Sequence, residues 1–385
     1  MGTQYKALSI MFDGLGHRTY GNLMREYFKE TSPENVDFYW FTEERELLLR
    51  ILLKPLFFSF PNQWVQKQNL DLRRYRGETA LAYVARRLLV RKLRQKDYSV
   101  IHLHTQAMAL RSIELIKKIP TVIGIDFTSV LASQEYTDSE FRWTYHPNVL
   151  LDKRVFEAAA CIVTWSERAR RSVIEDYQID ERKVKTIPPG VNLDLLTFSD
   201  KEKRDYSLPK ILFVGADFQR KGGYDLLEVF LKTFSDSAEL HLVTSAPFEC
   251  NHPNVHLHTN VQAYSPEWLK LYAEADIFVM PTYAEALGLV FMEAMAAGLP
   301  VIATNLPQIA ELVRHGETGF LIQPGDRHTL AANIRHLIEN PTLGSEMGAK
   351  GRRIVEQKFN AKTNFQTLES IFKELSVPNS VTIRT

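Results

Sequence analysis

The stretch that decides the fold spans residues 281–320 and reads PTYAEALGLVFMEAMAAGLPVIATNLPQIAELVRHGETGF. The apolar run that reaches Pro281 predicts the end of a buried strand, Glu285–Leu289 predicts a turn, and Phe291–Ala297 predicts the first turns of a helix. This pattern places Glu285 at the carboxyl edge of a strand and Glu293 near a helix start. Open α/β sheets bind their ligands at that edge.

The two acids of this stretch, Glu285 and Glu293, stand eight positions apart around Gly288. Carboxylates bind polyols well because their two oxygens accept hydrogen bonds from neighbouring sugar hydroxyls. The spacing therefore suggests a paired binding site. Glu293 has a second explanation, since a carboxylate near a helix N-terminus also complements the helix dipole.

A second element lies upstream, where residues 210–223 read KILFVGADFQRKGG. The pattern predicts a buried strand that ends at Gly215, a loop that contains Arg220 and Lys221, and a Gly-Gly pair that opens a helix. Glycines let backbone N–H groups approach an anion, the helix N-terminus adds a positive dipole, and Arg offers a bidentate fork beside the point charge of Lys. The loop is a candidate phosphate site, and a solvated basic turn is the alternative.

Together the two elements resemble the retaining glycosyltransferases of family 4, whose mark is a Glu, seven residues and a second Glu. The resemblance is dense from about Val184 to Phe359, and before that it rests on strand order, residues 14–17 and the SERAR and PPGVN segments. It implies a GT-B fold, an α/β architecture of two Rossmann-like, doubly wound parallel-sheet domains that face each other across a cleft.

The resemblance also implies roles for the residues of the donor site. Arg220 and Lys221 would hold the diphosphate of a nucleotide sugar. Glu293 would bind the ribose hydroxyls, and Glu285 the hydroxyls of the transferred sugar. The remaining donor contacts would come from Gly215, from the backbone amides of Gly288 and Leu289, and from Val261 beside the base.

The resemblance implies a reaction with retention at the anomeric carbon, and we expect a hexose to pass from a nucleotide diphosphate sugar to a hydroxyl of a lipid, glycan or small metabolite. A same-face route, in which the leaving diphosphate takes the acceptor proton, needs no protein nucleophile. Arg220 and Lys221 would then replace a divalent metal, and no Asp-x-Asp pair occurs in the chain. No cofactor is implied besides the donor. The alternatives are a nucleotide-sugar epimerase or phosphorylase of the same fold, and a non-catalytic partner that binds nucleotide sugar.

The acceptor is expected in the N-terminal half, where glycines follow the first strand. Gly14-Leu15-Gly16 resembles the glycine-rich loop of the family, although turns between strand and helix often contain glycine. Thr19 stands where a dinucleotide fingerprint needs glycine or alanine, so a dehydrogenase is disfavoured.

One position departs from the family pattern. Many members carry a histidine after the strand that corresponds to Thr121–Ile125, whereas this chain has Asp126. Asp126 is the candidate for acceptor orientation or proton handling, and a structural Asp that caps the next loop is the alternative. The nearby His102 and His104 are interpreted as core or edge histidines.

Length and charge agree with a two-domain enzyme. The chain has 385 residues, more than one hydrophobic core usually serves. Its formal net charge of +1 argues against a general nucleic-acid binder. Cys161 and Cys250 suggest neither a disulfide framework nor a zinc site, and we interpret both as buried thiols in a reducing cytosol. No apolar run approaches the roughly 20 residues that span a bilayer, so we expect a cytoplasmic protein.

One segment looks unlike an ordinary domain surface. Residues 47–64 read LLLRILLKPLFFSFPNQW, and many arginines follow as far as Lys96. Apolar and aromatic residues beside dense positive charge fit a peripheral contact of residues 47–96 with an anionic membrane surface. Two ordinary amphipathic helices with solvated basic faces are the alternative.

Alternating strand and helix patterns, such as a strand at Ala7–Phe12 and a helix at Gly21–Lys29, predict parallel sheets covered by helices. An irregular charged run predicts a domain boundary near residues 195–209. We therefore expect an acceptor domain over residues 1–200, a donor domain over 201–359 and a loose tail over 376–385. In the family the last helix, here 360–375, crosses back onto the N-terminal domain.

Overall fold

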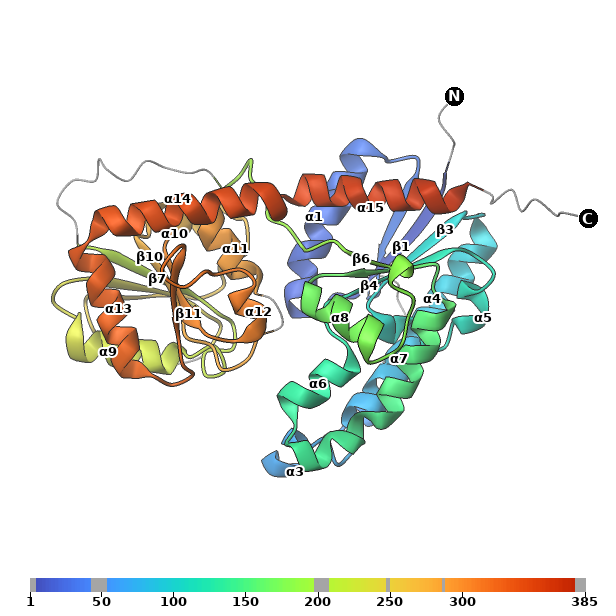
Figure 1. The fold of residues 1–385 in the computed structure, drawn as a ribbon, viewed down its shortest axis with the longest axis horizontal. Helices are drawn as coiled ribbons and strands as arrows, with labels where there is room; N and C mark the ends of the chain where they lie inside the picture. The colour runs from blue at the N-terminus through green and yellow to red at the C-terminus, as the bar shows by residue number, and fades with distance from the viewer. Residues whose placement is uncertain (1–4, 43–53, 197–207, 247–249, 286–287, 378–385) are drawn as a thin grey trace, which may run out of the picture. The chain divides into compact units, whose positions relative to one another are not determined.

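The computed structural model describes residues 5–42, 54–196, 208–246, 250–285 and 288–377. The chain divides into two compact units, of which unit 1 holds residues 1–188 and 363–385 and unit 2 holds residues 189–362. Each unit contains a six-stranded parallel sheet with helices packed around it (Figure 1). The predicted α/β class, with two doubly wound parallel sheets, is confirmed.

The sheet of unit 1 has the strand order β2-β1-β3-β4-β5-β6. Its strands are β1 (Ala7–Met11), β2 (Val36–Trp40), β3 (Val100–His104), β4 (Thr121–Ile125), β5 (Cys161–Thr164) and β6 (Val184–Thr186). Every residue of β1, β3, β4 and β5 is buried, which is typical of strands covered by helices on both faces. The chain continues from β1 to β2 on one side and to β3 on the other, so a topological switch point lies between β1 and β3.

The helices of unit 1 lie between these strands in the sequence, except for α15, which follows unit 2 at the C-terminal end of the chain. They are α1 (Leu15–Thr31), α3 (Gln63–Lys67), α4 (Arg73–Gln95), α5 (Ile113–Ile116), α6 (Ser129–Tyr136), α7 (His146–Ala158), α8 (Glu167–Glu175) and α15 (Ala361–Ser376), with 3-10 turns η1 (Lys54–Phe57), η2 (Gln106–Met108), η3 (Ser139–Tyr145) and η4 (Glu181–Lys183). Ser166 accepts a hydrogen bond from the Ala169 N–H at 3.1 Å, so the predicted cap of α8 is confirmed.

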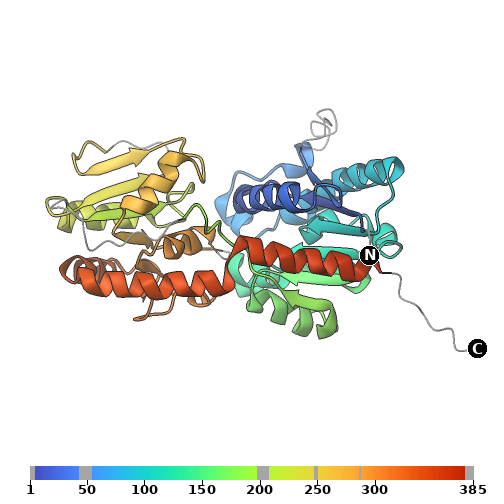
Figure 2. The ribbon, with the colours of Figure 1, turned by 90° about the horizontal axis from the view of Figure 1, so that it is seen from above.

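Helix α15 packs against α1 within unit 1, as the two views in Figures 1 and 2 show. The ring of Phe365 lies 5.4 Å from that of Tyr20. The rings of Phe28 and Phe372 stack at 6.0 Å. Between these aromatic contacts the Glu369 carboxylate accepts a hydrogen bond from the Tyr5 hydroxyl at 2.8 Å. The C-terminal helix is therefore part of the core of unit 1.

The sheet of unit 2 has the order β12-β11-β10-β7-β8-β9. Its strands are β7 (Lys210–Val214), β8 (Glu239–Val243), β9 (Val255–His258), β10 (Ile277–Met280), β11 (Val301–Thr304) and β12 (Gly319–Ile322). Its helices are α9 (Gly223–Thr233), α10 (Pro266–Glu274), α11 (Leu289–Ala296), α12 (Pro307–Ala310), α13 (Arg327–Glu339) and α14 (Pro341–Lys358). The direction of winding reverses between β7 and β10, which makes this the switch point of unit 2.

Three predictions of local structure were wrong. Helix α1 begins at Leu15 and not at Gly21, because Gly14 serves as an extended N-cap and Gly16 fits the first turn. Helix α11 begins at Leu289, which places Glu293 in its second turn and buries it. Cys161 is buried as predicted, whereas Cys250 is only half-buried.

Some predictions fall partly outside the described residues. These are residues 47–53 of the apolar segment, residues 197–207 of the expected domain boundary, and residues 378–385 of the expected tail. The observed division between the units lies at Pro188 and Pro189 on one side and at Lys362 and Thr363 on the other.

Candidate functional site

The switch point of unit 2 carries the two segments that the sequence singled out. One loop leaves β7 at Gly215 and leads into α9, and the other leaves β10 at Pro281 and leads towards α11. Because β7 and β10 are neighbouring parallel strands, both loops lie at the same carboxyl edge of the sheet.

Hydrogen bonds join the two loops around Arg220. Its carbonyl oxygen accepts from the Tyr283 N–H at 2.9 Å and from the Thr282 hydroxyl at 3.2 Å. Its guanidinium donates through Nη1 to the Ala284 carbonyl at 2.8 Å and through Nε to the Asp217 carboxylate at 3.0 Å. The Arg220 side chain is nevertheless 39% exposed, so these contacts fix the guanidinium while a ligand can still reach it.

Lys221 and Glu285 form an ion pair between the same two loops. Both side chains are largely buried, with exposed fractions of 13% and 12%. Burial lowers the pKa of the Lys221 ammonium, while the Glu285 carboxylate acts in the opposite direction. The amide of Gln308 donates to the Glu285 carbonyl, which fixes the backbone beneath this pair.

Two glycines allow the loops after β7 and β10 to approach each other closely. Gly222 has a φ of +75°, and a Cβ atom there would lie 2.1 Å from the Pro281 carbonyl oxygen. Gly288, the N-cap of α11, has a φ of +79°, and a Cβ atom there would lie 3.2 Å from Cγ of Glu285. Only glycine adopts such backbone angles without strain. Gly215 acts differently, since a Cβ atom there would press on the Lys221 side chain at 3.1 Å.

Glu293 lies apart from this ion pair, on the buried face of α11, and only 3% of it is exposed. The Tyr272 hydroxyl donates to its carboxyl at 3.2 Å, and Tyr264 lies close by. Burial raises the pKa of Glu293 to about 8, even though the two tyrosines favour the charged form. A buried carboxyl that is mostly protonated at neutral pH is costly to ionise, and a ligand that donates hydrogen bonds to it would lower that cost.

The remaining predicted donor residues flank the loops. Leu289 is the first residue of α11. Val261 follows β9, which is separated from β7 by β8, so its loop leaves the carboxyl edge of the sheet two strands away from the phosphate loop. The structure thus brings Arg220, Lys221, Glu285, Gly215 and Gly288 together, whereas Val261 belongs to the loop after another strand.

The switch point of unit 1 also holds a cluster of polar side chains. His17, in the first turn of α1, lies with Nδ1 3.0 Å from Nε2 of His104, the last residue of β3. Its Nε2 lies 3.4 Å from the carboxylate of Asp126, which follows β4. Burial alone would raise the pKa of Asp126, but His17 and His104 outweigh it and hold that pKa at about 2. Burial and the neighbouring His17 keep the pKa of His104 well below its ordinary value.

Asp126 does not cap the helix that follows it. The side chain that caps α6 is Thr128, whose hydroxyl accepts from the Leu131 N–H at 3.2 Å, and Asp126 faces His17 instead. His104 was interpreted as a core or edge histidine, and it is buried but also joined to His17. His102 is a core histidine, since it is buried and contacts the Ser9 hydroxyl at 2.9 Å.

His17 is a functional candidate that the sequence did not reveal. The available signal was its place directly after the first strand, next to Gly14 and Gly16. Gly14 is extended, and a Cβ atom there would lie 2.3 Å from the ring of Phe12. A Cβ atom at Gly16 would meet no atom within 4 Å. The space over this turn of α1 is open at Gly16.

A basic groove of about 600 Å³ lies along α4. It is lined by Tyr83, Arg86, Arg87, Val90, Arg91, Arg94 and Gln95. Nearer the start of α4, Arg76 donates to the carbonyls of Leu56 and Phe58 and so holds the segment before α3 against the helix. Several aromatic side chains of that region are about half exposed, namely Phe58, Phe60 and Trp64. Among the described residues, no helix has the length and apolar character needed to cross a membrane.

Two family models match the chain, one for each half. The model of the glycosyl transferases group 1 matches residues 208–340, and that of Glycosyltransferase Family 4 matches residues 41–195. Together with the doubly wound sheets, these matches identify the class of protein. The chain belongs to the family 4 (group 1) glycosyltransferases.

Relatives and solved structures agree with this membership. The capsular polysaccharide biosynthesis glycosyltransferase CapM of Staphylococcus aureus is 27% identical over 247 residues, which cover 58% of this chain and 64% of CapM. The match thus spans less than two thirds of that relative. The sucrose-phosphate synthase of Thermosynechococcus elongatus has a TM-score of 0.73 at 18% identity, over 96% of this chain and 99% of the other.

Another structural neighbour was solved with a nucleotide sugar. Alr3699/HepE of Anabaena, in complex with UDP-glucose, has a TM-score of 0.67 at 18% identity, over 96% of this chain and 100% of that chain. At these identities the likenesses concern the fold, which is the two-domain GT-B type that the sequence predicted.

Proposed function

We propose that this chain is a retaining glycosyltransferase that moves a hexose from a nucleotide diphosphate sugar to a hydroxyl of a lipid, glycan or small metabolite. The observation that carries the proposal is the meeting of Arg220, Lys221 and Glu285 at the switch point of unit 2. Two cations and a carboxylate at the carboxyl edge of a doubly wound sheet match a ligand that has phosphates at one end and hydroxyls at the other. Membership in the family supports the reaction class.

The diphosphate is assigned to Arg220 and Lys221. A guanidinium binds two phosphate oxygens at once, and the N-terminus of α9, directly after Gly222, adds a positive dipole. When the bond between the anomeric carbon and the diphosphate breaks, negative charge grows on the leaving oxygen. Cations already held in place stabilise that charge without reorganisation. We therefore propose that transfer needs no divalent metal and no further cofactor.

The sugar and the nucleoside are assigned to the second loop and its surroundings. Glu285, with the backbone amides of Gly288 and Leu289, would hold the hydroxyls of the hexose. Glu293 would accept hydrogen bonds from the ribose, and Val261 would lie beside the base. The binding of UDP-glucose by a protein of the same fold supports a nucleoside diphosphate sugar as donor.

The acceptor is assigned to the switch point of unit 1. In the same-face route the acceptor oxygen bonds to the anomeric carbon while the leaving diphosphate oxygen takes the acceptor proton. No protein nucleophile is required, so this part of the site has to orient the hydroxyl. Asp126 is ionised and in contact with His17, and the backbone at Gly14 and Gly16 lies beside them. The Asp126 carboxylate accepts hydrogen bonds, and the His17 imidazole can also donate one. The pair can therefore orient an acceptor hydroxyl.

We further propose that unit 1 contacts an anionic membrane, such as a cytoplasmic leaflet. Exposed Phe58, Phe60 and Trp64 suit the interfacial region of a bilayer, and the arginines of the α4 groove suit lipid phosphates. The arginines lie on α4, and Arg76 near the start of the same helix donates to the carbonyls of Leu56 and Phe58, so the segment that carries the aromatic side chains is held against this helix. Such a contact would bring the enzyme to a lipid-linked acceptor.

Turnover tests the reaction. Release of nucleoside diphosphate and formation of glycoside are measured with a panel of donors and acceptors in the presence of EDTA. We expect the Arg220→Ala variant to lose about 10² to 10³ in turnover, and Arg314→Ala, an exposed arginine of unit 2, to retain it. Unchanged turnover in Arg220→Ala, or a strict need for an added metal, would contradict the assignment.

Sedimentation with vesicles tests the membrane contact. We expect wild type to bind vesicles that contain anionic lipid, less so at high salt, and not to bind neutral ones. The double variant Arg87→Glu, Arg94→Glu should lose this binding. The double variant Lys270→Glu, Lys350→Glu has the same net charge and should retain it. Equal loss of vesicle binding in both variants would show that binding depends on net charge alone, and it would contradict a specific contact through the α4 groove.

A further inference from the structure

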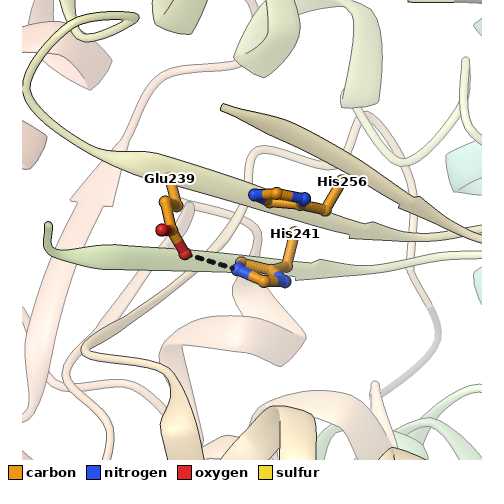
Figure 3. Close-up of side chains that lie close together, drawn as sticks. All are labelled: Glu239, His241 and His256. Carbon is orange, nitrogen blue, oxygen red and sulfur yellow. Dashed lines mark hydrogen bonds and ion pairs between the residues drawn. The ribbon is translucent and has the colours of Figure 1, made fainter. Parts of the chain in front are cut away.

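Four histidine and glutamate side chains gather on one face of strands β8 and β9, away from the loops described above. Glu239 and His241 are two residues apart on β8, and His256 and His258 are two residues apart on β9. Side chains at i and i+2 of a strand point to the same face. The register pairs His241 directly with His256, so both strands present these side chains to one another. Figure 3 shows the imidazole of His256 over that of His241, with Glu239 reaching His241 from the same strand.

We propose that Glu239, His241 and His256 bind a divalent transition-metal ion, with Zn²⁺ as the representative ion. One ligand atom from each of the three residues lies within 4.8 Å of the others. The Glu239 carboxylate is already 3.2 Å from Nε2 of His241, which is close to the separation of two ligands on one zinc ion. The His256 ring stacks on that of His241 with centroids 4.6 Å apart, and we infer that its nitrogen turns towards the ion on binding. Two imidazoles and a carboxylate favour first-row transition metals over Mg²⁺ or Ca²⁺.

A second shell of side chains supports the three ligands. Nδ1 of His241 lies 3.1 Å from Nε2 of His258, and Nδ1 of His258 lies 3.7 Å from the Glu267 carboxylate. With a metal on Nε2, His241 carries its proton on Nδ1 and donates it to His258. His258 then carries its own proton on Nδ1 and faces Glu267. The Nδ1 protons of His241 and His258 then each face an acceptor. Metal-bound histidines are typically oriented by such a partner on the other ring nitrogen.

Without a metal, the hydrogen-bonding groups that connect Glu239, His241, His258 and Glu267 are less well matched. His241 must then keep a proton on Nε2 to donate to Glu239, so its Nδ1 becomes an acceptor and His258 must donate from Nε2. The bare Nδ1 of His258 is left facing the Glu267 carboxylate. A cation in place of the Nε2 proton removes this conflict.

Lys210 is the one competing cation seen near Glu239 among the described residues, at 3.9 Å. Lys210 has a nearer partner in Glu274, at 3.0 Å, and Glu239 is therefore available for another cation. Glu239 and Lys210 are the first residues of β8 and β7, whereas the phosphate loop leaves the carboxyl end of β7. An ion here would join the edge strand β9 to β8 and stabilise unit 2 without taking part in sugar transfer.

Zinc binding to the full chain, prepared without a histidine tag and stripped with EDTA, tests this inference. Calorimetry and thermal melting with Zn²⁺ should show one bound equivalent and a raised melting temperature, and Mg²⁺ should do neither. Glu239→Gln and His256→Ala should each weaken binding at least about 100-fold, and His258→Ala by about 10- to 100-fold. His328→Ala removes an exposed histidine of α13 and should change nothing.

Two results would overturn the inference. One is an absence of zinc binding in wild type. The other is the same affinity and stoichiometry in Glu239→Gln and His256→Ala as in wild type. The melting temperature in EDTA verifies that each variant is folded, and Glu239→Gln, which preserves the size of the side chain, keeps the test valid if a histidine variant does not fold. The readout is independent of transferase activity.

Discussion

Lys221 and Glu285 lie 64 positions apart in the sequence and form a largely buried ion pair between the loops that follow β7 and β10. The pair places the residue assigned to the diphosphate in direct contact with the residue assigned to the sugar. Each side chain therefore influences how the other meets a ligand. The predictions below depend on this arrangement and on the polar cluster of unit 1.

Glu285→Gln should separate nucleotide binding from transfer. The amide keeps the shape of the side chain but no longer neutralises Lys221, so the ammonium becomes more available to a diphosphate. We expect the affinity for a nucleoside diphosphate to equal or exceed that of wild type, while transfer falls about 10²-fold or more because the sugar loses a charged acceptor with two oxygens. Calorimetry and turnover measure the two effects.

The same substitution should lower the stability of the ligand-free protein. Removal of one partner of a buried ion pair costs about 3–5 kcal/mol, because a charge is left without compensation. Glu317→Gln breaks the exposed ion pair with Arg314 and serves as the control, with an expected cost below about 1 kcal/mol. Weaker nucleotide binding in Glu285→Gln would contradict the proposed contact between Lys221 and phosphate.

Glu293 should make the ligand-free protein less stable as the pH rises. Its pKa is raised from the ordinary value of 4.5 to about 8, so the folded state binds a proton that the unfolded state releases over this interval. Stability is then lost between about pH 4.5 and 8, by up to about 1.4 kcal/mol per pH unit. Melting curves should show that Glu293→Gln removes this dependence and is more stable than wild type at pH 8.

Nucleotide binding provides the second readout for Glu293. Glu293→Ala removes the acceptor assigned to the ribose, so the affinity for nucleotide should fall while the affinity for inorganic diphosphate stays the same. A variant with unchanged nucleotide affinity would leave Glu293 with a role in the fold alone.

Asp126→Asn should lower turnover and leave nucleotide binding unchanged. With a pKa of about 2 the carboxylate is ionised throughout the range in which the enzyme can be assayed, and it is the charge partner of His17. Its stabilising effect is present above about pH 4 and is lost as the pH falls through 2. We expect turnover to drop about 10- to 100-fold, because His17 loses the negative charge that orients it.

Asp180 offers a matched control for this experiment. Its pKa is also about 2, because hydrogen bonds from Arg182 favour the charged form, but it lies on the surface at the N-cap of η4. Asp180→Asn should therefore leave turnover unchanged. A large fall in nucleotide affinity in Asp126→Asn would place Asp126 in the donor site and refute its assignment to the acceptor.

Two Gly→Ala substitutions should behave in opposite ways. Gly222→Ala forces a left-handed residue to carry a Cβ atom 2.1 Å from the Pro281 carbonyl, so we expect a loss of at least about 1 kcal/mol of stability together with nucleotide binding. At Gly16 the space is open and φ is ordinary, so Gly16→Ala should fold with an equal or slightly higher melting temperature. Lost turnover in this stable variant would indicate that a substrate approaches the backbone at Gly16.

The sequence predicted the strands well because they are short, buried apolar runs. The strand at Thr121–Ile125 has the predicted bounds, and the strand predicted at Ala7–Phe12 ends one residue earlier, at Met11. The start of α1 was predicted too late, because Gly14 and Gly16 are typical of a loop when the residues that surround them in the fold are unknown. Helix propensity does not indicate that a glycine will serve as an N-cap.

The site residues that belong to a sequence motif could be predicted. Those that are brought together only by tertiary contacts could not. Arg220, Lys221 and Glu285 were named from two segments, and the structure brings these segments together. The contact of His17 with Asp126 depends on the order in which β1, β3 and β4 are arranged in the sheet. The burial of Glu293 beside Tyr272 depends on a contact between residues of α11 and α10, which sequence spacing does not reveal.

The most direct test of the central claim is a thermal-shift panel of nucleoside diphosphates and their sugars with wild type and Arg220→Ala. A ligand that binds only the folded state stabilises it by about 2.7 kcal/mol at a concentration of 100 Kd. We expect one base to raise the melting temperature of wild type selectively and Arg220→Ala to lose most of that shift. The absence of a shift with every nucleotide, or an equal shift in Arg220→Ala, would contradict the proposed donor site.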